Sequence, residues 1–370
     1  MRKAFIVADS AVTPLGFSGA SNFQQIADGV TGVKPQANEH FGTGNFYLSH
    51  CSNVAETPGS TRFESLATTA LAQLQKQITI PKKRTLLILS TTKGNIELLE
   101  KGQPNHPRLH LYQVSDMLAT QMGIEKNIVV SNACTSGVVA ILLAKRQIES
   151  GNFDHVVVLG ADALSRFIIS GFQSLNALSH APCKPFDSAR IGLNLGEAAA
   201  SVLVTAFPQE FSAHYKVAIE GGAITNDSNH ISGPSKTGEE LAMAIRQAMT
   251  EAKVSPSDMG FISAHGTATL YNDEMESKAF NLAEMNDTPC HSLKGNFGHT
   301  LGAAGVLETV MSIHSLVNHE LIPSFGFENI GVSKPLNMIR KRESSIINIA
   351  LKTASGFGGC NAAIVLKYEN

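Results

Sequence analysis

The sequence predicts an α/β fold, because short apolar runs alternate with longer helical stretches along the whole chain. Segments rich in glycine and proline separate the two kinds of run. The chain has 370 residues, of which 43% are hydrophobic and 16% are charged. This length is too great for one simple core, so we expect two similar lobes or one large layered domain.

The strands are predicted at short runs of β-branched and other apolar residues. Residues 4–8 (AFIVA) read as a first buried strand, and residues 127–130 (NIVV) form a compact β-branched run. The expected strands are residues 4–8, 85–90, 127–130, 155–159, 198–205, 216–220, 261–263, 346–350 and 362–367.

The helices are predicted at longer stretches with helical periodicity. Residues 138–148 (VVAILLAKRQI) have the length of a helix, and Gly151 follows them as a stop signal. The expected helices are residues 21–29, 61–77, 111–121, 137–150, 238–252, 272–280 and 302–317.

Residues 206–215 (AFPQEFSAHY) form the best internal boundary, since they contain Pro208 and lie between two predicted strands. We therefore divide the chain into an N-terminal half, residues 1–210, and a C-terminal half, residues 211–370. No sequence repeat is obvious between the halves, so these patterns alone do not establish a duplicated architecture.

The bulk composition narrows the class of protein. The net charge of −2 gives no global field for nucleic acid, and no apolar run approaches the ~18 residues that span a bilayer. The short apolar run at the N-terminus meets Asp9 too early for a signal peptide. The basic clusters at residues 82–84, 145–146 and 340–342 are mostly expected to be solvated surface, although one could receive an acidic protein partner.

The cysteines favour a reducing compartment. The chain has five, at positions 51, 134, 183, 290 and 360, widely scattered and without a CxxC pair. This pattern argues against a disulfide framework and against a zinc site, so we expect a cytoplasmic protein.

Cys134 lies in a turn of small and polar residues, 131–137 (SNACTSG), between a predicted strand and a predicted helix. This placement puts the thiol at the first helical turn, where free N–H groups and the macrodipole favour an anion. A helix N-terminus lowers the pKa of a cysteine thiol, so a nucleophile is expected here. A lone cysteine is more often structural, but two later histidine loops favour the nucleophile.

The two histidines stand in loops rich in glycine. His265 follows the predicted strand 261–263, at the edge of the sheet where ligands collect in open α/β folds. Thr267 and Thr269 supply hydroxyls that suit an amide-bearing ligand. His299 precedes the predicted apolar helix 302–317.

A metal site at these histidines is an alternative that their spacing argues against. His265 and His299 lack the i,i+4 spacing of a helical zinc site, and no cysteine or carboxylate cluster flanks them closely. We therefore expect no metal.

A third glycine loop, residues 355–359 (SGFGG), precedes the predicted strand 362–367. A dinucleotide fingerprint needs a helix after the loop, so the order argues against that function. Bent glycine loops can instead supply backbone N–H groups to an oxyanion hole. A helix-tip cysteine, two imidazoles and this loop together suit acyl transfer through a thioester.

Taken in order, these motifs make the chain similar to the elongating β-ketoacyl–acyl carrier protein synthases of the thiolase superfamily. The resemblance spans nearly the whole length. It rests on six ordered blocks at residues 11–16, 133–137, 177–197, 265–276, 294–305 and 356–361.

The resemblance implies a five-layered αβαβα thiolase fold with two similar halves. It also implies an acyl carrier protein as partner, with 4′-phosphopantetheine arriving on that carrier and no cofactor bound by the chain itself. A homodimer is implied, and a heterodimer with a related ketosynthase is an alternative.

The resemblance further implies roles for individual residues. Cys134 would take the acyl chain, while His265 and His299 would assist decarboxylation of a malonyl thioester and hold the resulting enolate. Lys294 and Glu276 would form a supporting ion pair near the histidines.

Three further residues complete the implied site. Thr267 and Thr269 would hydrogen-bond the phosphopantetheine arm. Phe357 would be a gate beside the thiol, and its amide and that of Cys134 would form the oxyanion hole.

The chain departs from the family pattern near the nucleophile and in the last loop. Ser131 and Asn132 stand where Asp-Thr is frequent, and Gly137 stands where Ser is common. Ser355 and Cys360 replace a frequent aromatic residue and a frequent threonine. The segment before Cys134 is also short, which affects the region that shapes the acyl pocket and the dimer edge.

Related chemistries remain as alternatives. A degradative thiolase would use a second cysteine ahead of the last glycines, but Cys360 follows them. An initiating synthase would have asparagine where this chain has His299. A chain-length factor that pairs with a ketosynthase typically lacks the cysteine, whereas this chain keeps Cys134. The products could belong to fatty acid, polyketide or polyene elongation.

Overall fold

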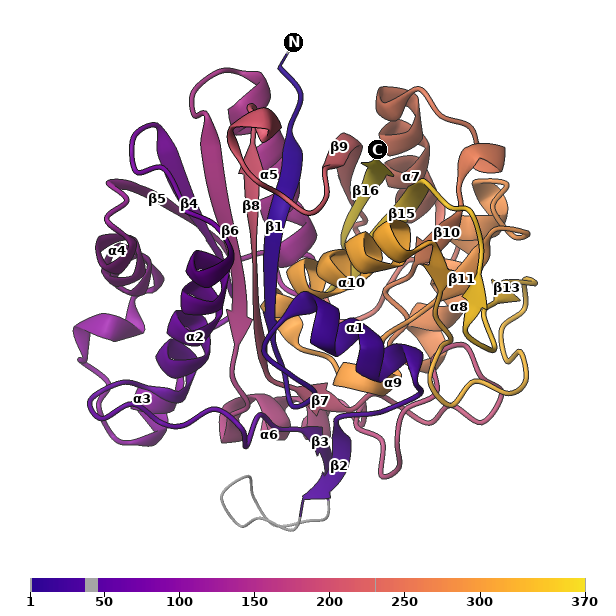
Figure 1. The fold of residues 1–370 in the computed structure, drawn as a ribbon. Coiled ribbons are helices and arrows are strands. Elements are labelled where there is room, and N and C mark those ends of the chain that lie inside the picture. Colours follow the sequence, from indigo (N-terminus) through magenta and orange to yellow (C-terminus); the bar gives the residue numbers. More distant parts are fainter. Residues whose placement is uncertain (1, 37–45, 230, 370) are drawn as a thin grey trace.

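The computed structural model describes residues 2–36, 46–229 and 231–369, and an eleven-stranded sheet runs through it (Figure 1). Its N-terminal strands are β1 (Phe5–Val12), β4 (Thr85–Ser90), β5 (Lys126–Val130), β6 (His155–Asp162) and β8 (Ala198–Thr205). Its C-terminal strands are β9 (Val217–Asn226), β10 (Phe261–Ser263), β11 (Pro289–His291), β15 (Ile349–Gly356) and β16 (Cys360–Tyr368), with β13 (Asn337–Met338) at the edge.

Both groups of five strands have the same topology. From the middle of the sheet outward, the order is β1-β8-β6-β4-β5 on one side and β9-β16-β15-β10-β11 on the other. In chain order, each is first, fifth, fourth, second and third. In each group the second, third and fourth strands in chain order run parallel to one another. The fifth strand runs antiparallel to its two neighbours, the fourth and the first. The two similar halves are therefore present, although no repeat in the sequence reveals them.

The halves meet where β1 pairs with β9 through Phe5 and Ile6. The strand pattern ends with β8 and restarts with β9, and a short 3₁₀ turn (Pro208–Glu210) lies between them. We propose residues 1–210 and 211–370 as the two halves on this basis.

The helices form three layers around the sheet (Figure 1). α2 (Arg62–Gln77) and α4 (Leu111–Met122) cover the outer face of the N-terminal strands. α7 (Glu239–Ala252) and α8 (Leu270–Leu282) cover the outer face of the C-terminal strands. α5 (Ser136–Glu149) and α10 (Ala304–Asn318) pack on each other between strands of both halves, with α1 (Gly19–Ala27) against α10. This is the expected αβαβα arrangement.

The alternation of side chains along the strands builds separate cores on the two faces of the sheet. Leu86 and Ile88 of β4 join the core around α5 and α10, whereas Leu87 and Leu89 join the core under α2 and α4. In β16, Ile364 joins the central core and Val365 joins the core under α7 and α8. Such continuous apolar strands are typical of sheets buried on both faces.

Smaller elements surround the ends of the strands. They are β2 (Val33–Gln36), β3 (Phe46–Ser49), α3 (Glu97–Glu100), a 3₁₀ turn (Pro107–Leu109), α6 (Arg166–Ser174), β7 (Leu195–Gly196), a 3₁₀ turn (Pro256–Asp258), α9 (Lys294–Phe297), a 3₁₀ turn (Leu301–Ala303), β12 (Glu320–Leu321) and β14 (Glu343–Ser344). β2, β3 and β7 form a small three-stranded sheet, and β12 pairs with β14.

The predicted strands at 85–90, 198–205 and 261–263 have the observed bounds. The strand predicted at residues 346–350 is placed too early, because β15 begins at Ile349 and continues through Lys352 to Gly356. The polar residues of that run hid its strand character. α6 and β11 were not predicted.

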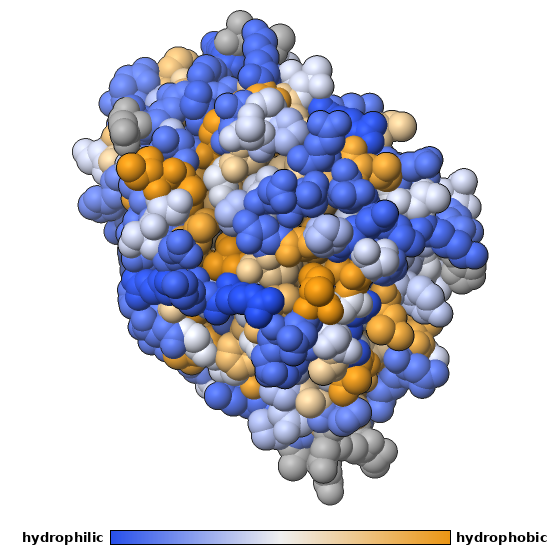
Figure 2. Space-filling model, turned by 90° about the vertical axis from the view of Figure 1, so that its right-hand side faces the viewer, coloured by the Kyte–Doolittle hydropathy of each residue, from blue (hydrophilic) through white to orange (hydrophobic). Residues whose placement is uncertain are grey.

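The face that carries α7, α8 and β13 is mostly hydrophilic, with apolar side chains gathered near its middle (Figure 2). Exposed apolar residues of α7 and α8 include Met243, Leu270, Tyr271 and Leu282. Among the described residues, no helix has the length and apolar character needed to cross a membrane.

Candidate active site

Cys134 sits in a tight turn between β5 and α5. Ala133, directly before it, has a φ of 47°, a left-handed conformation that costs a non-glycine residue about 1–2 kcal/mol. Within this turn the Ser136 hydroxyl donates to the carbonyl of Ala133 and accepts from the Asn132 amide. The strained turn presents the sulfur just ahead of the helix, as the sequence predicts.

The pKa of the Cys134 thiol differs from the expectation. Burial raises it to about 11, although the charge of Lys294 and the backbone amides of Phe357 and Cys134 work in the opposite direction. The expected lowering by the helix N-terminus was wrong, because desolvation of the thiolate outweighs it at this buried position. The resting group is a neutral thiol.

The last glycine loop closes over the same turn. β15 and β16 form a hairpin whose tip carries Phe357, and a β-carbon on Gly356 would lie 3.0 Å from Cys134 N. The amides of Phe357 and Cys134 are thereby close enough to hydrogen-bond the sulfur. Two converging backbone N–H groups are the donors that an acyl oxyanion needs.

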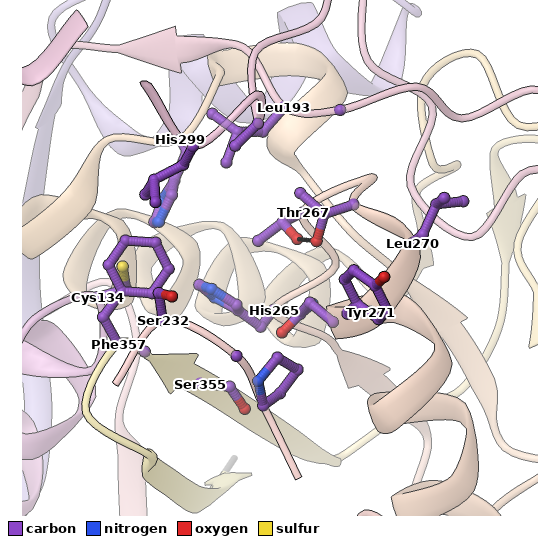
Figure 3. Close-up of a pocket in the computed structure, with 18 of the residues that line it drawn as sticks. Cys134, Leu193, Ser232, His265, Thr267, Leu270, Tyr271, His299, Ser355 and Phe357 are labelled. Atoms are coloured by element: carbon purple, nitrogen blue, oxygen red, sulfur yellow. Dashed lines mark hydrogen bonds between the residues drawn. The ribbon is translucent and has the colours of Figure 1, made fainter. Parts of the chain in front are cut away.

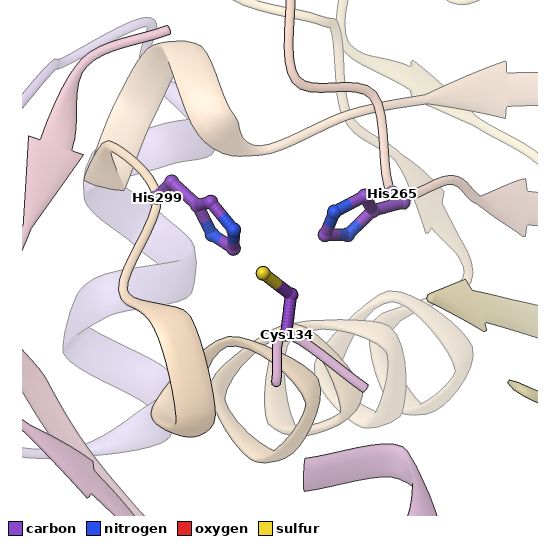
Figure 4. Close-up of side chains that lie close together, drawn as sticks. All are labelled: Cys134, His265 and His299. Carbon is purple, nitrogen blue, oxygen red and sulfur yellow. The ribbon is translucent and has the colours of Figure 1, made fainter. Parts of the chain in front are cut away.

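The thiol converges with both predicted histidines (Figure 4). Ligand atoms of Cys134, His265 and His299 all lie within 4.8 Å of one another, and the two imidazole centroids are 5.2 Å apart at 81°. Within the described part of the chain, Nδ1 of His265 and both ring nitrogens of His299 lack a hydrogen-bond partner. Buried polar atoms without partners are rare, so these nitrogens point to a ligand.

Both imidazoles are neutral. Burial, followed by the charge of Lys294, places the pKa of His265 and of His299 well below the ordinary value. A neutral imidazole can donate one hydrogen bond and accept another.

His299 is positioned by backbone pairing. Its amide donates to the carbonyl of Asn194 at 2.7 Å, and its carbonyl accepts from the amide of Gly196 at 3.0 Å. Gly298, just before it, has a φ of 65°, which lets the chain turn out of α9.

The turn that carries His265 is held by buried charges. Lys294 Nζ donates to the carbonyl of His265 at 3.1 Å, while Glu276 accepts from the amides of His265 and Gly266 at 2.8 and 2.6 Å. The expected ion pair between Lys294 and Glu276 was wrong: Lys294 pairs with Glu308 of α10 instead. The two residues hold opposite sides of one turn, Lys294 at the carbonyl of His265 and Glu276 at the amides.

A cavity of about 600 Å³ leads to this cluster (Figure 3). Thr267 and Thr269 line it and hydrogen-bond each other at 2.9 Å. Phe357 lines it too, and its ring stacks on Phe172 of α6 with centroids 5.7 Å apart. Leu270 and Tyr271, 60% and 79% exposed, form part of an apolar wall that suits an arm or chain with CH₂ groups.

Comparison with known proteins assigns the family. Residues 105–207 match the family model described as beta-ketoacyl synthase, N-terminal domain, and residues 217–328 match the C-terminal domain of the same family. A 3-oxoacyl-[acyl-carrier-protein] synthase 2 from Vibrio cholerae is 31% identical over 297 residues, 74% of this chain and 71% of that protein. This chain belongs to the beta-ketoacyl synthase family. It is therefore an acyltransferase.

Further relatives match the synthase over its whole length. A putative mitochondrial 3-oxoacyl-[acyl-carrier-protein] synthase from Schizosaccharomyces pombe is 27% identical, with 99% of both chains covered. The structure of a ketosynthase in complex with its chain length factor from Xenorhabdus doucetiae has a TM-score of 0.88 and 29% identity, covering 100% of this chain and 98% of that chain. A beta-ketoacyl synthase from Burkholderia phymatum shares the fold at a TM-score of 0.87 and 22% identity, with 100% of both chains covered.

Sequence reasoning missed two charged residues of the synthase site. Glu308 lies in α10 and Lys352 in β15, and both are buried. A signal was present for Glu308, a lone carboxylate in an otherwise apolar predicted helix, whereas Lys352 fell between the predicted strands 346–350 and 362–367 and no predicted element marked it as buried. Charged residues are almost never fully buried unless they are paired.

The same cysteine and histidines form, among the described residues, a group that could hold a metal ion. The positive charges of Lys294, Lys352 and Lys93 all act on His299 and disfavour a further cation there. We therefore keep the expectation that the synthase uses no metal.

Proposed function

We propose that the synthase joins an acyl group held on Cys134 to malonyl-acyl carrier protein by decarboxylative Claisen condensation, giving a 3-ketoacyl-acyl carrier protein. One observation carries this proposal: ligand atoms of a thiol and two neutral imidazoles lie within 4.8 Å of one another, three of the four ring nitrogens have no hydrogen-bond partner among the described residues, and two backbone amides reach the sulfur. The reaction would serve fatty acid elongation or polyketide and polyene elongation.

The first step transfers the acyl group to the enzyme. The sulfur of Cys134 attacks the acyl thioester as its proton passes to a neighbouring imidazole nitrogen, which the geometry supports. The amides of Cys134 and Phe357 hold the oxyanion, and the pantetheine thiolate leaves and takes up the proton. A neutral thiol suits this concerted transfer, because a resting thiolate is not required.

The second step generates the carbon nucleophile. The malonyl thioester carbonyl accepts hydrogen bonds from His265 and His299, and CO₂ leaves with its bonding electrons passing into the enolate. A neutral imidazole stabilises the enolate oxygen without handing over a proton that would quench it. The depressed pKa of both histidines supports this role.

The third step forms the new C–C bond. The enolate carbon attacks the Cys134 thioester, and the same two amides hold the new oxyanion. Collapse of this intermediate expels the Cys134 thiolate, which takes up a proton from solvent, because its own proton left with the pantetheine thiol in the first step. The product leaves on its carrier.

The carrier brings 4′-phosphopantetheine, so the chain itself binds no cofactor in this proposal. The hydroxyls of Thr267 and Thr269 in the cavity wall support a role in gripping the amides of that arm. Phe357 is proposed as a gate, because it is 40% exposed and lies at the tip of a hairpin loop.

The basic clusters differ in their suitability for carrier docking. Residues 82–84 precede β4, whose other end is level with the end of β5 and the Cys134 turn. Six residues of strand separate the two edges by about 20 Å, so this cluster is poorly placed. Residues 340–342 follow β13, at the same sheet edge as His265, and are the better candidate.

We propose a homodimer, with a heterodimer as the alternative, and a cytoplasmic location. A chain-length-factor-like role is the second candidate, since one similar structure is a ketosynthase in complex with such a factor. The intact cysteine and both histidines favour a catalytic chain. All five cysteines are free thiols, which supports a reducing compartment.

The test supplies the purified synthase with an acyl carrier and a malonyl carrier and follows three readouts: acyl-Cys134, CO₂ and 3-ketoacyl product. All three are expected from the wild type, and Cys134→Ala should lose the acyl-enzyme and the product. If acyl-Cys134, CO₂ and the 3-ketoacyl product are all absent, both with and without an added ketosynthase, the proposal is contradicted. Activity only when a related ketosynthase is added, and independent of Cys134, would favour the chain-length-factor role.

A further inference from the structure

Lys352 is a fully buried lysine in the middle of β15. Its relative exposure is 0%, and Ala350, Leu351 and Ala354 around it are core residues. Its Nζ lies 2.7 Å from Glu308 Oε2. Burying an ammonium group is costly, so a lysine at a strand position that could hold an apolar residue calls for an explanation.

Glu308 binds two ammonium groups at once. Lys294 contacts Oε1 and Lys352 contacts Oε2 of the same carboxylate. One carboxylate cannot balance two ammonium groups, so this cluster carries excess positive charge beside the imidazoles.

The two lysines also hold consecutive carbonyl groups. Lys352 Nζ donates to the carbonyls of Ser263 and Ala264 at 3.1 and 3.3 Å, and Lys294 Nζ donates to that of His265 at 3.1 Å. Every carbonyl from the last residue of β10 to the histidine thus contacts an ammonium group anchored on Glu308.

The amides of the same turn are held by carboxylates. Glu276 accepts from residues 265 and 266, and Asp273 accepts from residues 267 and 268. Ala268 has a φ of 61°, so the turn is strained and needs such support. The backbone of His265 is therefore fixed by charge on both sides.

We propose that Lys352 is a positioning residue for His265, fixing the turn that carries this imidazole and adding buried positive charge that keeps both imidazoles neutral. This inference rests on the proposed function, because it concerns the decarboxylation step. The family resemblance implies roles for Lys294 and Glu276, but it implies none for Lys352.

The charges around the imidazoles support the electrostatic part. Lys294 and Lys352 act on both imidazoles, Lys93 acts on His299, and the Cys134 thiol lies beside both rings. Glu308 binds the two nearer lysines, while Glu276 and Asp273 accept from the amides of the His265 turn. Burial lowers the pKa of His265 most, and Lys294, His299 and Lys352 lower it further. Removing the Lys352 charge should therefore raise the pKa of both histidines, so that they protonate at a higher pH.

The test compares Lys352→Met with the wild type in CO₂ release from malonyl-carrier, measured as a function of pH. We expect kcat to fall at least tenfold with KM within twofold, and the acid limb of the kcat profile to move to higher pH. Lys352→Arg, which keeps the charge, should restore the position of that limb. Lys145→Met is the matched control, because Lys145 is also buried between two carboxylates but lies at the far end of α5 from Cys134.

The outcomes separate the inference from the proposed function. A Lys352→Met profile that superimposes on the wild type after correction for the folded fraction, as expected of Lys145→Met, would overturn the inference alone. A wild type that releases no CO₂ would overturn the proposed function. In that case NMR titration of the histidine ring signals still tests the inference. The ring signals of His265 and His299 must titrate at higher pH in Lys352→Met than in the wild type. If Lys352→Met does not fold, Lys352→Gln, whose amide can still donate to a carbonyl, carries the same expectations.

Discussion

Gly137 of α5 and Gly305 of α10 touch backbone to backbone at the centre of the molecule. A β-carbon on Gly137 would lie 2.7 Å from Gly305 Cα and 2.6 Å from Val306 N. Real β-carbons do not approach other atoms this closely, so the two central helices depend on both glycines. Because Cys134 precedes α5 and His299 precedes α10, this contact also sets the distance between nucleophile and imidazole.

Gly137→Ala should destabilise the synthase by about 2 kcal/mol, in the range of overpacked cores. The added methyl group meets backbone atoms, which cannot turn aside, so the helices must separate. Denaturant unfolding measures the loss. Gly171→Ala is the control: this exposed glycine of α6 has open space at its β-carbon and should gain about 0.5–1 kcal/mol. If Gly137→Ala is as stable as the wild type, the claim that this helix contact leaves no room for a methyl group is wrong.

Phe357→Ala should make Cys134 react faster with a small alkylating reagent. The ring stacks on Phe172 and lines the cavity that leads to the thiol, which is only 8% exposed. The substitution removes the ring but keeps the backbone amide that we assign to the oxyanion hole. Mass spectrometry of alkylated Cys134 against time gives the rate. Phe167→Ala, which removes a 61% exposed ring of α6, should leave the rate unchanged.

The sequence predicted the parts of the site whose position depends on local chain order. Cys134 had to lie between β5 and α5, and His265 at the end of β10, because strand and helix patterns fix those places. The convergence of Cys134, His265 and His299 followed only from the family resemblance, because it depends on how the two halves pack. No periodicity encodes that packing.

The prediction of which buried charged residues pair with one another was the main failure. The family resemblance implied Glu276 as the partner of Lys294, but the pairing depends on which side of the His265 turn each helix approaches. The prediction of a lowered pKa for the Cys134 thiol was wrong for a similar reason. The helix terminus can be recognised in the sequence, whereas the depth of burial cannot.

The alkylation rate of Cys134 should rise with pH through the whole alkaline range. Burial raises the pKa of this thiol to about 11, so between pH 7 and 10 the thiolate fraction grows tenfold per pH unit. Iodoacetamide labelling of the wild type, corrected with Cys134→Ala for other thiols, measures this. A plateau below pH 9 would show instead that the helix terminus and Lys294 prevail over burial.

His299→Ala should lower decarboxylation and condensation about 10²–10³-fold, the usual effect of losing one oxyanion donor. Acylation of Cys134 should stay measurable, because we assign the oxyanion of that step to the amides of Cys134 and Phe357, which reach the sulfur. Carbon dioxide release and acyl-enzyme formation, followed on the same preparation, separate the two effects. Equal loss of both would contradict the assigned role. His319→Ala is a control of the same type, since this half-buried histidine lies at the other end of α10.

Glu276→Gln should change how the stability of the synthase depends on pH. Burial, followed by the charge of Asp273, raises the pKa of Glu276 to about 7 from its ordinary 4.5. The folded protein therefore holds a proton that the unfolded chain releases between these values, and the contribution to stability is lost as pH rises through 7. Glutamine does not titrate, so the free energy of unfolding of the wild type relative to Glu276→Gln should be larger at pH 5 than at pH 8. Denaturant unfolding at both pH values measures this difference.

Glu251→Gln should show the opposite pH dependence. Burial would raise the pKa of Glu251, but hydrogen bonds from Arg146 and Lys145 lower it to about 2. The contribution of Glu251 to stability is therefore present above pH 4.5 and is lost on acidification. A difference that stays constant from pH 5 to 8 for Glu276→Gln would mean that this carboxylate is already ionised throughout, held by the amides of His265 and Gly266.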